Sequence, residues 1–263
     1  MLRTYKTKLV EKNKLTEDVF LFNFKLIDPP EINFSAGQYM ILNVPQPGGE
    51  KVKRLYSITS SEIEKNSLEF IVQLVPNGLA STHLDNLKVG DGVVFEGPAG
   101  AFVLRKNEND KVFLATGTGI APIRAIIISN LKSQISNPNL KTKNLYYLFW
   151  GLRYFKDIYL FDEFRELTEK QPNFQFKICL SREENLDAVP EQNKKYFSLG
   201  HVDKEINNLC STPNQSRLNR DGSGQALKDT DFYICGGREV VGSLKSRLVE
   251  KGISQENIYF EKF

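Results

Sequence analysis

A glycine-rich turn after an apolar run is the strongest chemical signal in the sequence. The run LATGTGIAPIRAII covers residues 114–127, and Gly117, Thr118 and Gly119 allow a tight turn with exposed N–H groups. Pro122 stands where a helix begins, a position at which its missing N–H is tolerated. Because helix N-termini attract anions, the turn suits a pyrophosphate. It is not the G-x-G-x-x-G fingerprint, since a proline holds the last position, and a plain turn remains an alternative.

A basic and aromatic segment, RLYSITSS at residues 54–61, is the second signal. Arg54 can neutralise a phosphate with a planar fork of donors. Tyr56, on the same strand face, can stack on a flat ring, and Ser57 faces the opposite side. By itself the segment is equally an ordinary half-buried strand that carries a surface arginine.

The first 105 residues have the pattern of short strands separated by turns. Turn residues divide the segments, which are rich in β-branched and aromatic residues. They are VFLFNFKLI (19–27), QYMILNV (38–44), SLEFIVQLV (67–75) and GVVFEG (92–97). Several strands with no convincing helix between them predict a closed antiparallel β-barrel.

After about residue 110, apolar strands alternate with helices. The expected strands are 111–116, 144–150, 174–180, 231–236 and 257–263, and the expected helices are 121–133, 157–170, 202–209 and 238–251. Alternation of this kind predicts an open parallel sheet with right-handed crossovers. We therefore expect two domains, residues 1–106 and 107–263, the second of α/β class.

Composition restricts the function classes. Of 263 residues, 40% are hydrophobic and 25% charged, and the net charge of +3 is too small to imply nucleic acid but leaves room for an acidic protein partner. No signal peptide or membrane span is evident. Cys179, Cys210 and Cys235 form no disulfide framework or metal site, and only His83 and His201 are present. We expect a cytoplasmic protein without metal.

The segment 211–229 is polar and too long for a plain connection between a helix and a strand. A mobile surface loop is the first interpretation, and a lid or docking loop is the alternative.

Seven short motifs occur in order along nearly the whole chain: RLYS (54–57), NGLASTHL (77–84), GPAGAF (97–102), GTGIAP (117–122), GLR (151–153), CGG (235–237) and EKF (261–263). Each is common, but in this combination the sequence resembles the ferredoxin–NADP reductase superfamily. The resemblance implies a β-barrel FAD-binding domain followed by an NAD(P)-binding α/β domain. It also implies a monomeric flavoprotein that takes hydride from NADPH onto FAD and passes electrons to ferredoxin or flavodoxin.

The resemblance implies a set of flavin contacts in the first domain. Arg54 would bind the FAD pyrophosphate, Tyr56 would stack on the isoalloxazine, and Ser57 would lie near flavin N5. Ser81, in the turn that begins at Gly78, would donate to the pyrophosphate, and an N-cap role for Ser81 is compatible with this. The full implied set is Arg54, Leu55, Tyr56, Ser57, Ile71, Val72, Gln73, Gly78, Leu79, Ala80 and Ser81.

In the second domain the implied nucleotide contacts follow the carboxyl ends of strands, where open α/β sheets bind ligands. They are Thr118, Gly119, Gly151, Leu152, Gly236 and Gly237. Ser181 and Arg182 resemble the plant-type site for the adenosine 2′-phosphate, which favours NADPH. Lys194, Lys195 and Tyr196 are further candidates there at a longer spacing, and a solvated Ser-Arg loop is the alternative.

The residues expected at the reacting atoms are Ser57, Cys235, Glu261 and Phe263. Cys235 would approach the nicotinamide, or is a buried structural thiol. Phe263 would stack on the flavin and move aside for hydride transfer, with Phe in place of the plant-type Tyr. The alternative is a plain strand end.

Three other functions are open. The same fold serves free-flavin or quinone reductases and NADH-dependent reductase components of oxygenase systems. It also serves electron-transfer subunits of larger complexes, which carry a C-terminal cysteine cluster that this sequence lacks. A Ser-His-Asp hydrolase is disfavoured because neither histidine lies in a motif.

Overall fold

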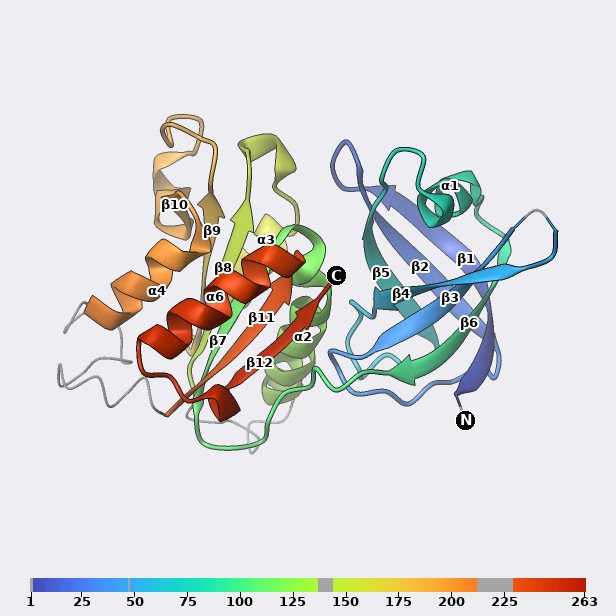
Figure 1. The fold of residues 1–263 in the computed structure, drawn as a ribbon, viewed down its shortest axis with the longest axis horizontal. Coiled ribbons are helices and arrows are strands. Elements are labelled where there is room, and N and C mark those ends of the chain that lie inside the picture. The colour runs from blue at the N-terminus through green and yellow to red at the C-terminus, as the bar shows by residue number, and fades with distance from the viewer. Residues whose placement is uncertain (1, 47, 137–143, 212–228) are drawn as a thin grey trace. The chain divides into compact units, whose positions relative to one another are not determined.

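The computed structural model describes residues 2–46, 48–136, 144–211 and 229–263, so the loop expected at 211–229 lies outside it except for its end residues. The chain forms two compact units, each built on one six-stranded sheet (Figure 1). The first unit comprises Met1–Arg105 and Ala121–Ser133, and the second comprises Lys106–Ile120 and Gln134–Phe263. The predicted domain bounds, 1–106 and 107–263, stay a prediction.

The first unit is an antiparallel sheet in the order β4-β3-β6-β1-β2-β5. The strands are β1 (Arg3–Lys14), β2 (Val19–Asp28), β3 (Tyr39–Pro45), β4 (Lys51–Ser57), β5 (Ser67–Gln73) and β6 (Gly92–Ala99). The sheet curls so that its edge strands approach, and the ring centroids of Tyr56 on β4 and Phe70 on β5 are 6.5 Å apart. Among the described residues these two edge strands form no ladder, but just beyond β4 the Thr59 N–H donates to the Glu69 carbonyl on β5 at 2.9 Å, and side-chain packing makes the rest of the closure.

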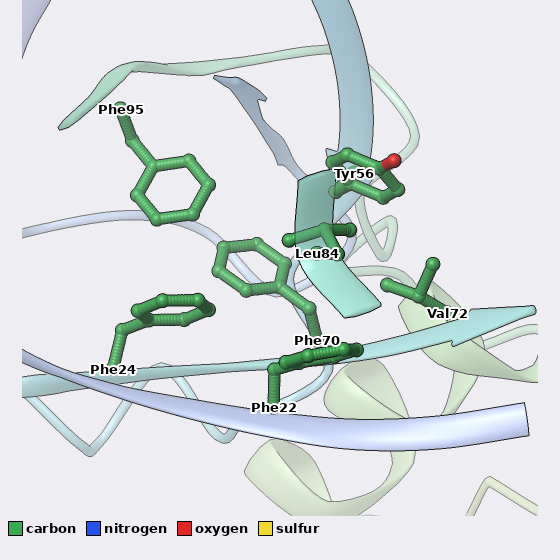
Figure 2. Close-up of a pocket in the computed structure, with 7 residues that line it drawn as sticks. All are labelled: Phe22, Phe24, Tyr56, Phe70, Val72, Leu84 and Phe95. Atoms are coloured by element: carbon green, nitrogen blue, oxygen red, sulfur yellow. The ribbon is translucent and has the colours of Figure 1, made fainter. Parts of the chain in front are cut away.

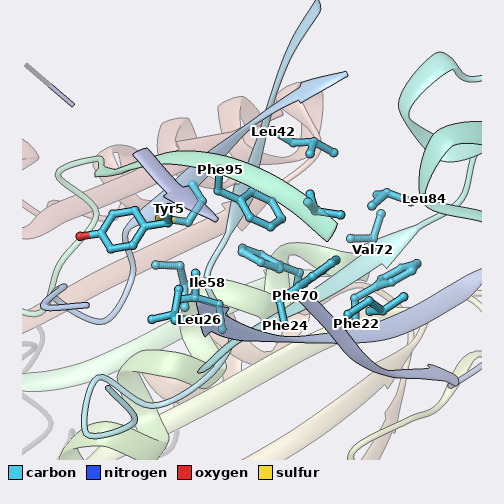
Figure 3. Close-up of a cluster of buried hydrophobic side chains, with 14 of the residues drawn as sticks. Tyr5, Phe22, Phe24, Leu26, Leu42, Ile58, Phe70, Val72, Leu84 and Phe95 are labelled. Carbon is cyan, nitrogen blue, oxygen red and sulfur yellow. The ribbon is translucent and has the colours of Figure 1, made fainter. Parts of the chain in front are cut away.

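Aromatic side chains fill the curled sheet. Phe24, Phe70 and Phe95 meet with ring centroids 5.0–6.0 Å apart (Figure 3). Burying each such ring stabilises the fold by about 1.5–3 kcal/mol. A helix, α1 (Leu79–Asn86), adds Ala80 and Leu84 to this core. The expectation of no helix among the strands is wrong here, because two buried positions in eight residues give almost no apolar periodicity.

The second unit is a parallel sheet in the order β10-β9-β8-β7-β11-β12. Its strands are β7 (Asp110–Thr116), β8 (Tyr146–Leu152), β9 (Phe174–Leu180), β10 (Phe197–Leu199), β11 (Thr230–Gly236) and β12 (Ile258–Lys262). The five predicted strands are present. The edge strand β10 was not expected, because three residues are too few to show a strand pattern.

Helices cover both faces of this parallel sheet. Helix α4 (Val202–Ser211) and helix α6 (Arg238–Glu250) share one apolar cluster with the sheet, whereas Phe164 on α3 (Phe161–Lys170) contacts Trp150 and Phe174. Helix α2 (Ile120–Ser136) follows a short 3₁₀ turn, η1 (Gly117–Gly119), and lies with the first unit from Ala121 to Ser133. None of the helices in the described ranges has the length and hydropathy needed to cross a bilayer.

Candidate functional site

The predicted nucleotide contacts come together at the carboxyl edge of the parallel sheet. Strand register places Cys235 beside Ala115 and Glu261, and Gly151 beside Thr116. The turns that follow β7, β8, β9 and β11 therefore share one edge, as parallel topology requires. The strand ends and the turns after them carry Thr118, Gly119, Gly151, Leu152, Ser181, Arg182, Cys235, Gly236 and Gly237.

Two glycines at this edge are fixed by close packing, and two leave open space. A Cβ on Gly119 would lie 2.2 Å from the Cys235 carbonyl oxygen, and a Cβ on Gly236, whose φ is +157°, would lie 2.0 Å from Thr116 Oγ1. On Gly117 and Gly237 a Cβ would meet no described atom within 4 Å. The turns after β7 and β11 thus pack on each other while their outer sides can admit a ligand.

The turn after β7 is held by two aromatic side chains that sequence reasoning missed. The Gly117 carbonyl oxygen accepts hydrogen bonds from Trp150 Nε1 at 2.9 Å and from the Tyr159 hydroxyl at 3.3 Å. The Ile120 N–H donates to the carbonyls of Gly117 and Thr118. A tryptophan in a buried strand needs a hydrogen-bond acceptor for its N–H, and this requirement is the sequence feature that could have predicted such a contact. The turn is therefore shaped by the protein itself.

The segment after β9 is also held through its backbone. Ser181 donates to the Leu152 carbonyl from its N–H at 3.0 Å and from Oγ at 3.2 Å, and the Arg182 N–H donates to the Arg153 carbonyl. The exposed Arg182 guanidinium lies 6.0 Å from the centroid of the Tyr154 ring. Arg182 is thus anchored by its backbone and presents its charge to solvent.

The more distant candidates lie on a 3₁₀ segment, Glu191–Tyr196, with partners of their own. Lys194 pairs with Glu191 at 2.7 Å, and Lys195 lies over the Tyr196 ring. That ring is buried and stacks on Phe176 with centroids 4.9 Å apart. None of these contacts reaches Ser181 or Arg182, so their role at a 2′-phosphate stays a prediction.

Cys235, Glu261 and Phe263 meet where β11 and β12 end. The Cys235 side chain is 1% exposed, and burial, together with the Glu261 charge, raises the pKa of the thiol well above its usual value. Cys235 is therefore a neutral thiol near pH 7, which is compatible with a place at the nicotinamide and with a structural role. The Phe263 N–H donates to the Gly236 carbonyl at 3.4 Å, and its ring is 58% exposed.

In the first unit, the candidate residues Tyr56 on β4 and Val72 on β5 meet beside helix α1. Tyr56, Val72 and Leu84, one from each element, surround a small hollow with four phenylalanines, and the Tyr56 hydroxyl points away from those rings (Figure 2). The hollow is a packing gap of the core. Burial raises the pKa of Tyr56, and the nearby Arg54 charge opposes this shift.

Around this core edge, Arg54 and Leu55 are exposed, and Arg54 Nη1 donates to the Lys53 carbonyl at 2.9 Å. Ile71 and Val72 are both buried. Gln73 Nε2 donates to Asp18 Oδ2 at 2.6 Å.

Within the described part of the chain, no side-chain capping hydrogen bond is made at the start of helix α1. Its N-cap is Gly78, which makes no side-chain capping bond. Ser81 lies three residues into the helix and its Oγ accepts from the Val75 N–H at 2.9 Å, so the N-cap interpretation of Ser81 is wrong. Uncapped N–H groups at a helix start suit an anion, and Arg54 supplies a cation on a neighbouring element. The residues present therefore fit a diphosphate.

Both halves of the chain match oxidoreductase families. Residues 6–104 match the oxidoreductase FAD-binding domain, and residues 113–245 match the oxidoreductase NAD-binding domain. The chain belongs to the ferredoxin–NADP reductase superfamily. It is an oxidoreductase of the ferredoxin-reductase type, with one domain for FAD and one for a nicotinamide nucleotide.

The curated relatives of this reductase-type chain are longer than the part of them that it matches. It is 28% identical to the toluate 1,2-dioxygenase electron transfer component of Pseudomonas putida, over 98% of the chain and 67% of that protein. It is also 28% identical to one of the subunits of the Na(+)-translocating NADH-quinone reductase of Actinobacillus pleuropneumoniae, over 95% of the chain and 58% of that protein. The chain thus spans about three fifths to two thirds of these relatives.

Solved structures share the fold over the full reductase chain. The cytochrome P450 reductase of Amycolatopsis superposes with a TM-score of 0.79 and 26% identity, over 100% of this chain and 70% of that one. The ferredoxin NADP+ reductase of Neisseria gonorrhoeae, solved with FAD and NADP, gives a TM-score of 0.74 at 21% identity over 98% of each chain. At this level of identity, the similarity to the Neisseria gonorrhoeae protein shows a shared fold.

Proposed function

We propose that this protein is an NADPH-dependent reductase that passes electrons from FAD to ferredoxin or flavodoxin. The observation that carries the proposal is the open carboxyl edge of the parallel sheet, where Gly117 and Gly237 leave room for a ligand beside a prefolded turn. FAD, when bound, supplies the two-electron and one-electron chemistry. The protein supplies binding, orientation and charge.

The flavin-binding role is assigned to β4, β5 and the start of α1. Arg54 pairs with the diphosphate, and the N–H groups of Leu79, Ala80 and Ser81 donate to it at the uncapped helix start. Tyr56 offers a ring and an unionised hydroxyl, because burial raises its pKa. Leu55, Ser57, Ile71, Val72, Gln73 and Gly78 complete this set.

The nucleotide-binding role is assigned to the carboxyl edge. Thr118, Gly119, Gly151 and Leu152 present backbone groups there, as do Gly236 and Gly237 after β11. Cys235 and Glu261 adjoin the nicotinamide, and the neutral thiol adds no charge to that contact. The exposed Phe263 ring, attached beside Gly236, occupies the nicotinamide position until nucleotide displaces it.

NADPH is proposed over NADH because Arg182 presents an exposed guanidinium on a fixed backbone. A guanidinium donates charge-assisted hydrogen bonds to a phosphate, and Ser181 adds a hydroxyl. The adjacent carboxylate of Glu183 accepts from the Phe155 N–H at 2.8 Å, so that acid is engaged within the protein.

A protein acceptor is proposed because relatives are named electron transfer component and reductase component. The same names favour a second candidate, the reductase component of an oxygenase system, which would use the same binding edge with NADH. A free-flavin or quinone reductase and an electron-transfer subunit of a larger complex are the further alternatives.

The test is reconstitution followed by turnover. The purified chain should bind one FAD. NADPH should bleach the bound FAD faster than NADH does, and the reduced protein should then reduce ferredoxin or flavodoxin faster than free FMN. Absence of flavin binding would refute the assignment of the first unit. Faster reaction with NADH would replace the first candidate by the second, and faster reaction with free FMN would refute a protein acceptor.

A further inference from the structure

Helix α2 is joined to the first unit by a partly buried arginine. Arg124 Nη1 donates to the carbonyl oxygen of Thr59 at 2.9 Å and to Glu69 Oε2 at 2.8 Å. The Arg124 side chain is only 12% exposed, so this ion pair is screened less than a surface pair. A hydrogen bond to a charged group contributes about 1.5–3 kcal/mol, which makes Arg124 more than a surface contact.

The backbone of Thr59 is fixed from both sides by this arrangement. Its N–H donates to the Glu69 carbonyl at 2.9 Å, while its carbonyl accepts from Arg124. Glu69 thus binds Thr59 through its backbone and Arg124 through its side chain. The Thr59 hydroxyl is buried and has no hydrogen-bond partner in the described part of the chain, so the peptide groups alone make these contacts.

A second side chain of α2 extends the attachment along the same segment. Ser129 Oγ lies 3.1 Å from Ser61 Oγ and accepts from the Glu62 N–H at 2.9 Å. Ser61 and Ser129 are both buried. Residues 59–62 are therefore attached to α2 at two points, and the Arg124 contact is the one nearer to Ser57.

At its other end, α2 continues directly from the turn after β7. Ile120, its first residue, donates its N–H to the carbonyls of Gly117 and Thr118. Arg124 lies one helical turn beyond Ile120, on the same face. Arg124 therefore lies in the part of α2 that belongs to the first unit, where it holds the backbone two residues past Ser57.

We propose that Arg124 is a positioning residue for hydride transfer. By holding the Thr59 carbonyl it fixes, within the first unit, the segment that presents Tyr56 and Ser57 to the flavin. Misplacement of reacting groups by about 1 Å costs up to ~100-fold in rate, so a loosened contact should slow the chemical step. This inference rests on the proposed function, because a positioning role requires that the protein transfers hydride to FAD.

The test compares Arg124→Met, which removes both hydrogen bonds and keeps the apolar stem, with Arg124→Lys, which restores a donor and the charge. Glu69→Gln removes the ion pair and leaves the Thr59 contact. Lys6→Ala is the control, because it breaks a 3.0 Å ion pair in the same unit whose side chains are 67% and 66% exposed. All variants are measured as FAD-loaded protein, with flavin content determined for each.

Anaerobic stopped-flow with NADPH separates a positioning role from a stabilising one. For Arg124→Met we expect the limiting rate of flavin bleaching per bound FAD to fall about 10- to 100-fold, with the nucleotide dissociation constant unchanged within about twofold. Arg124→Lys should recover most of the rate, Glu69→Gln should be intermediate, and Lys6→Ala should match the parent. In the FAD-free protein, amide hydrogen exchange at residues 59–62 should be faster in Arg124→Met than in the parent.

The outcomes also separate this inference from the proposed function. If the parent flavin is bleached and the limiting rate per bound FAD in Arg124→Met is unchanged, Arg124 only stabilises the fold and the inference is wrong. If Arg124→Met does not fold, equal limiting rates in Glu69→Gln, Arg124→Lys and the parent would overturn it instead. If neither NADPH nor NADH bleaches the flavin of the parent protein, the proposed function is refuted, and the positioning role is refuted with it.

Discussion

The carboxyl edge of the second unit and the candidate flavin-binding region of the first are built from different kinds of residue. In the second, parallel strands end together, and most candidate groups are backbone atoms of glycine-rich turns. In the first, the candidates come from β4 and β5, at opposite ends of the sheet order, and from the short helix α1. Topology assembles the second set, whereas curling of the sheet and side-chain packing assemble the first.

This contrast teaches where each region is vulnerable. At a backbone-built edge, an added side chain does harm, because a Cβ would occupy space that a neighbouring strand or a ligand needs. At an edge that depends on a charged side chain, removing that charged group does harm. The two regions should therefore respond in opposite ways to small-residue and truncation variants.

The largest effect is expected from Gly119→Ala in the second unit. Its Cβ would lie 2.2 Å from the carbonyl oxygen of Cys235, a backbone atom that cannot move without displacing β11. Strain of this kind should lower the free energy of unfolding by more than about 3 kcal/mol, measured by urea denaturation.

Gly242→Ala is the matched control for that substitution. Gly242 is exposed within α6, and a Cβ there meets no described atom within 4 Å. Alanine in a helix interior should raise stability by about 0.5–1 kcal/mol. Equal stability of the two variants would show that the packing of β7 on β11 does not depend on glycine.

The next effect is expected at the side-chain-built edge. Arg54→Ala removes an exposed cation whose described hydrogen bond is to its neighbour's carbonyl, so folding should be little affected. If Arg54 binds the diphosphate, FAD affinity should fall roughly ten- to a hundredfold, since a charge-assisted contact contributes about 1.5–3 kcal/mol. Fluorescence titration of FAD-free protein measures this.

Lys53→Ala provides the comparison for Arg54, because Lys53 is the adjacent cation but pairs with Glu96 at 3.1 Å. It should leave FAD affinity within about twofold of the parent, as expected for an exposed ion pair. Equal losses in both variants would indicate a general charge effect rather than a diphosphate contact at Arg54.

A smaller effect is expected where the second unit does use a side chain. Arg182→Ala should lower kcat/KM for NADPH about tenfold, because one charge-assisted phosphate contact exceeds about 1.4 kcal/mol. NADH kinetics should barely change. Lys170→Ala breaks an exposed ion pair on α3 and should leave kcat/KM unchanged for both nucleotides. A parent that uses both nucleotides equally would contradict the 2′-phosphate assignment while leaving the fold untouched.

The same contrast explains how much could be predicted from the sequence. The five longer strands of the second unit were expected because buried parallel strands are continuous apolar runs, and their shared edge follows from topology. The support of Gly117 by Trp150 and Tyr159 could not be predicted, because it depends on contacts 33 and 42 residues apart along the chain. The same holds for Arg124, which belongs to the helix after the turn but bonds to Thr59 and Glu69.

In the first unit, prediction failed where pairing and helix signals are weak. Helix α1 buries only Ala80 and Leu84, and the approach of β4 to β5 is made by rings such as Tyr56 and Phe70 rather than by a ladder. Ser81 was compatible with an N-cap by residue type, but its hydroxyl accepts from Val75, which only the path of the chain determines.

The smallest expected effect tests whether the scaffold beneath the backbone-built edge is closed to solvent. Cys179 on β9 lies beside Gly151 in register, and burial raises the pKa of its thiol from 9.0 to about 12. The folded protein therefore keeps a proton that the unfolded chain releases above pH 9. The stabilising contribution is complete below that pH and declines as the pH rises from 9 toward 12.

Comparison with Cys179→Ala isolates this contribution, because the lost packing is the same at every pH and the other titrating groups are shared. The stability advantage of the parent over the variant should be constant below about pH 8 and smaller by about 0.8 kcal/mol at pH 9.5. Urea unfolding of both proteins across this range measures the difference. A difference that stays constant to pH 9.5 would mean that solvent reaches the thiol, and the carboxyl edge would then be a looser support than its strand register implies.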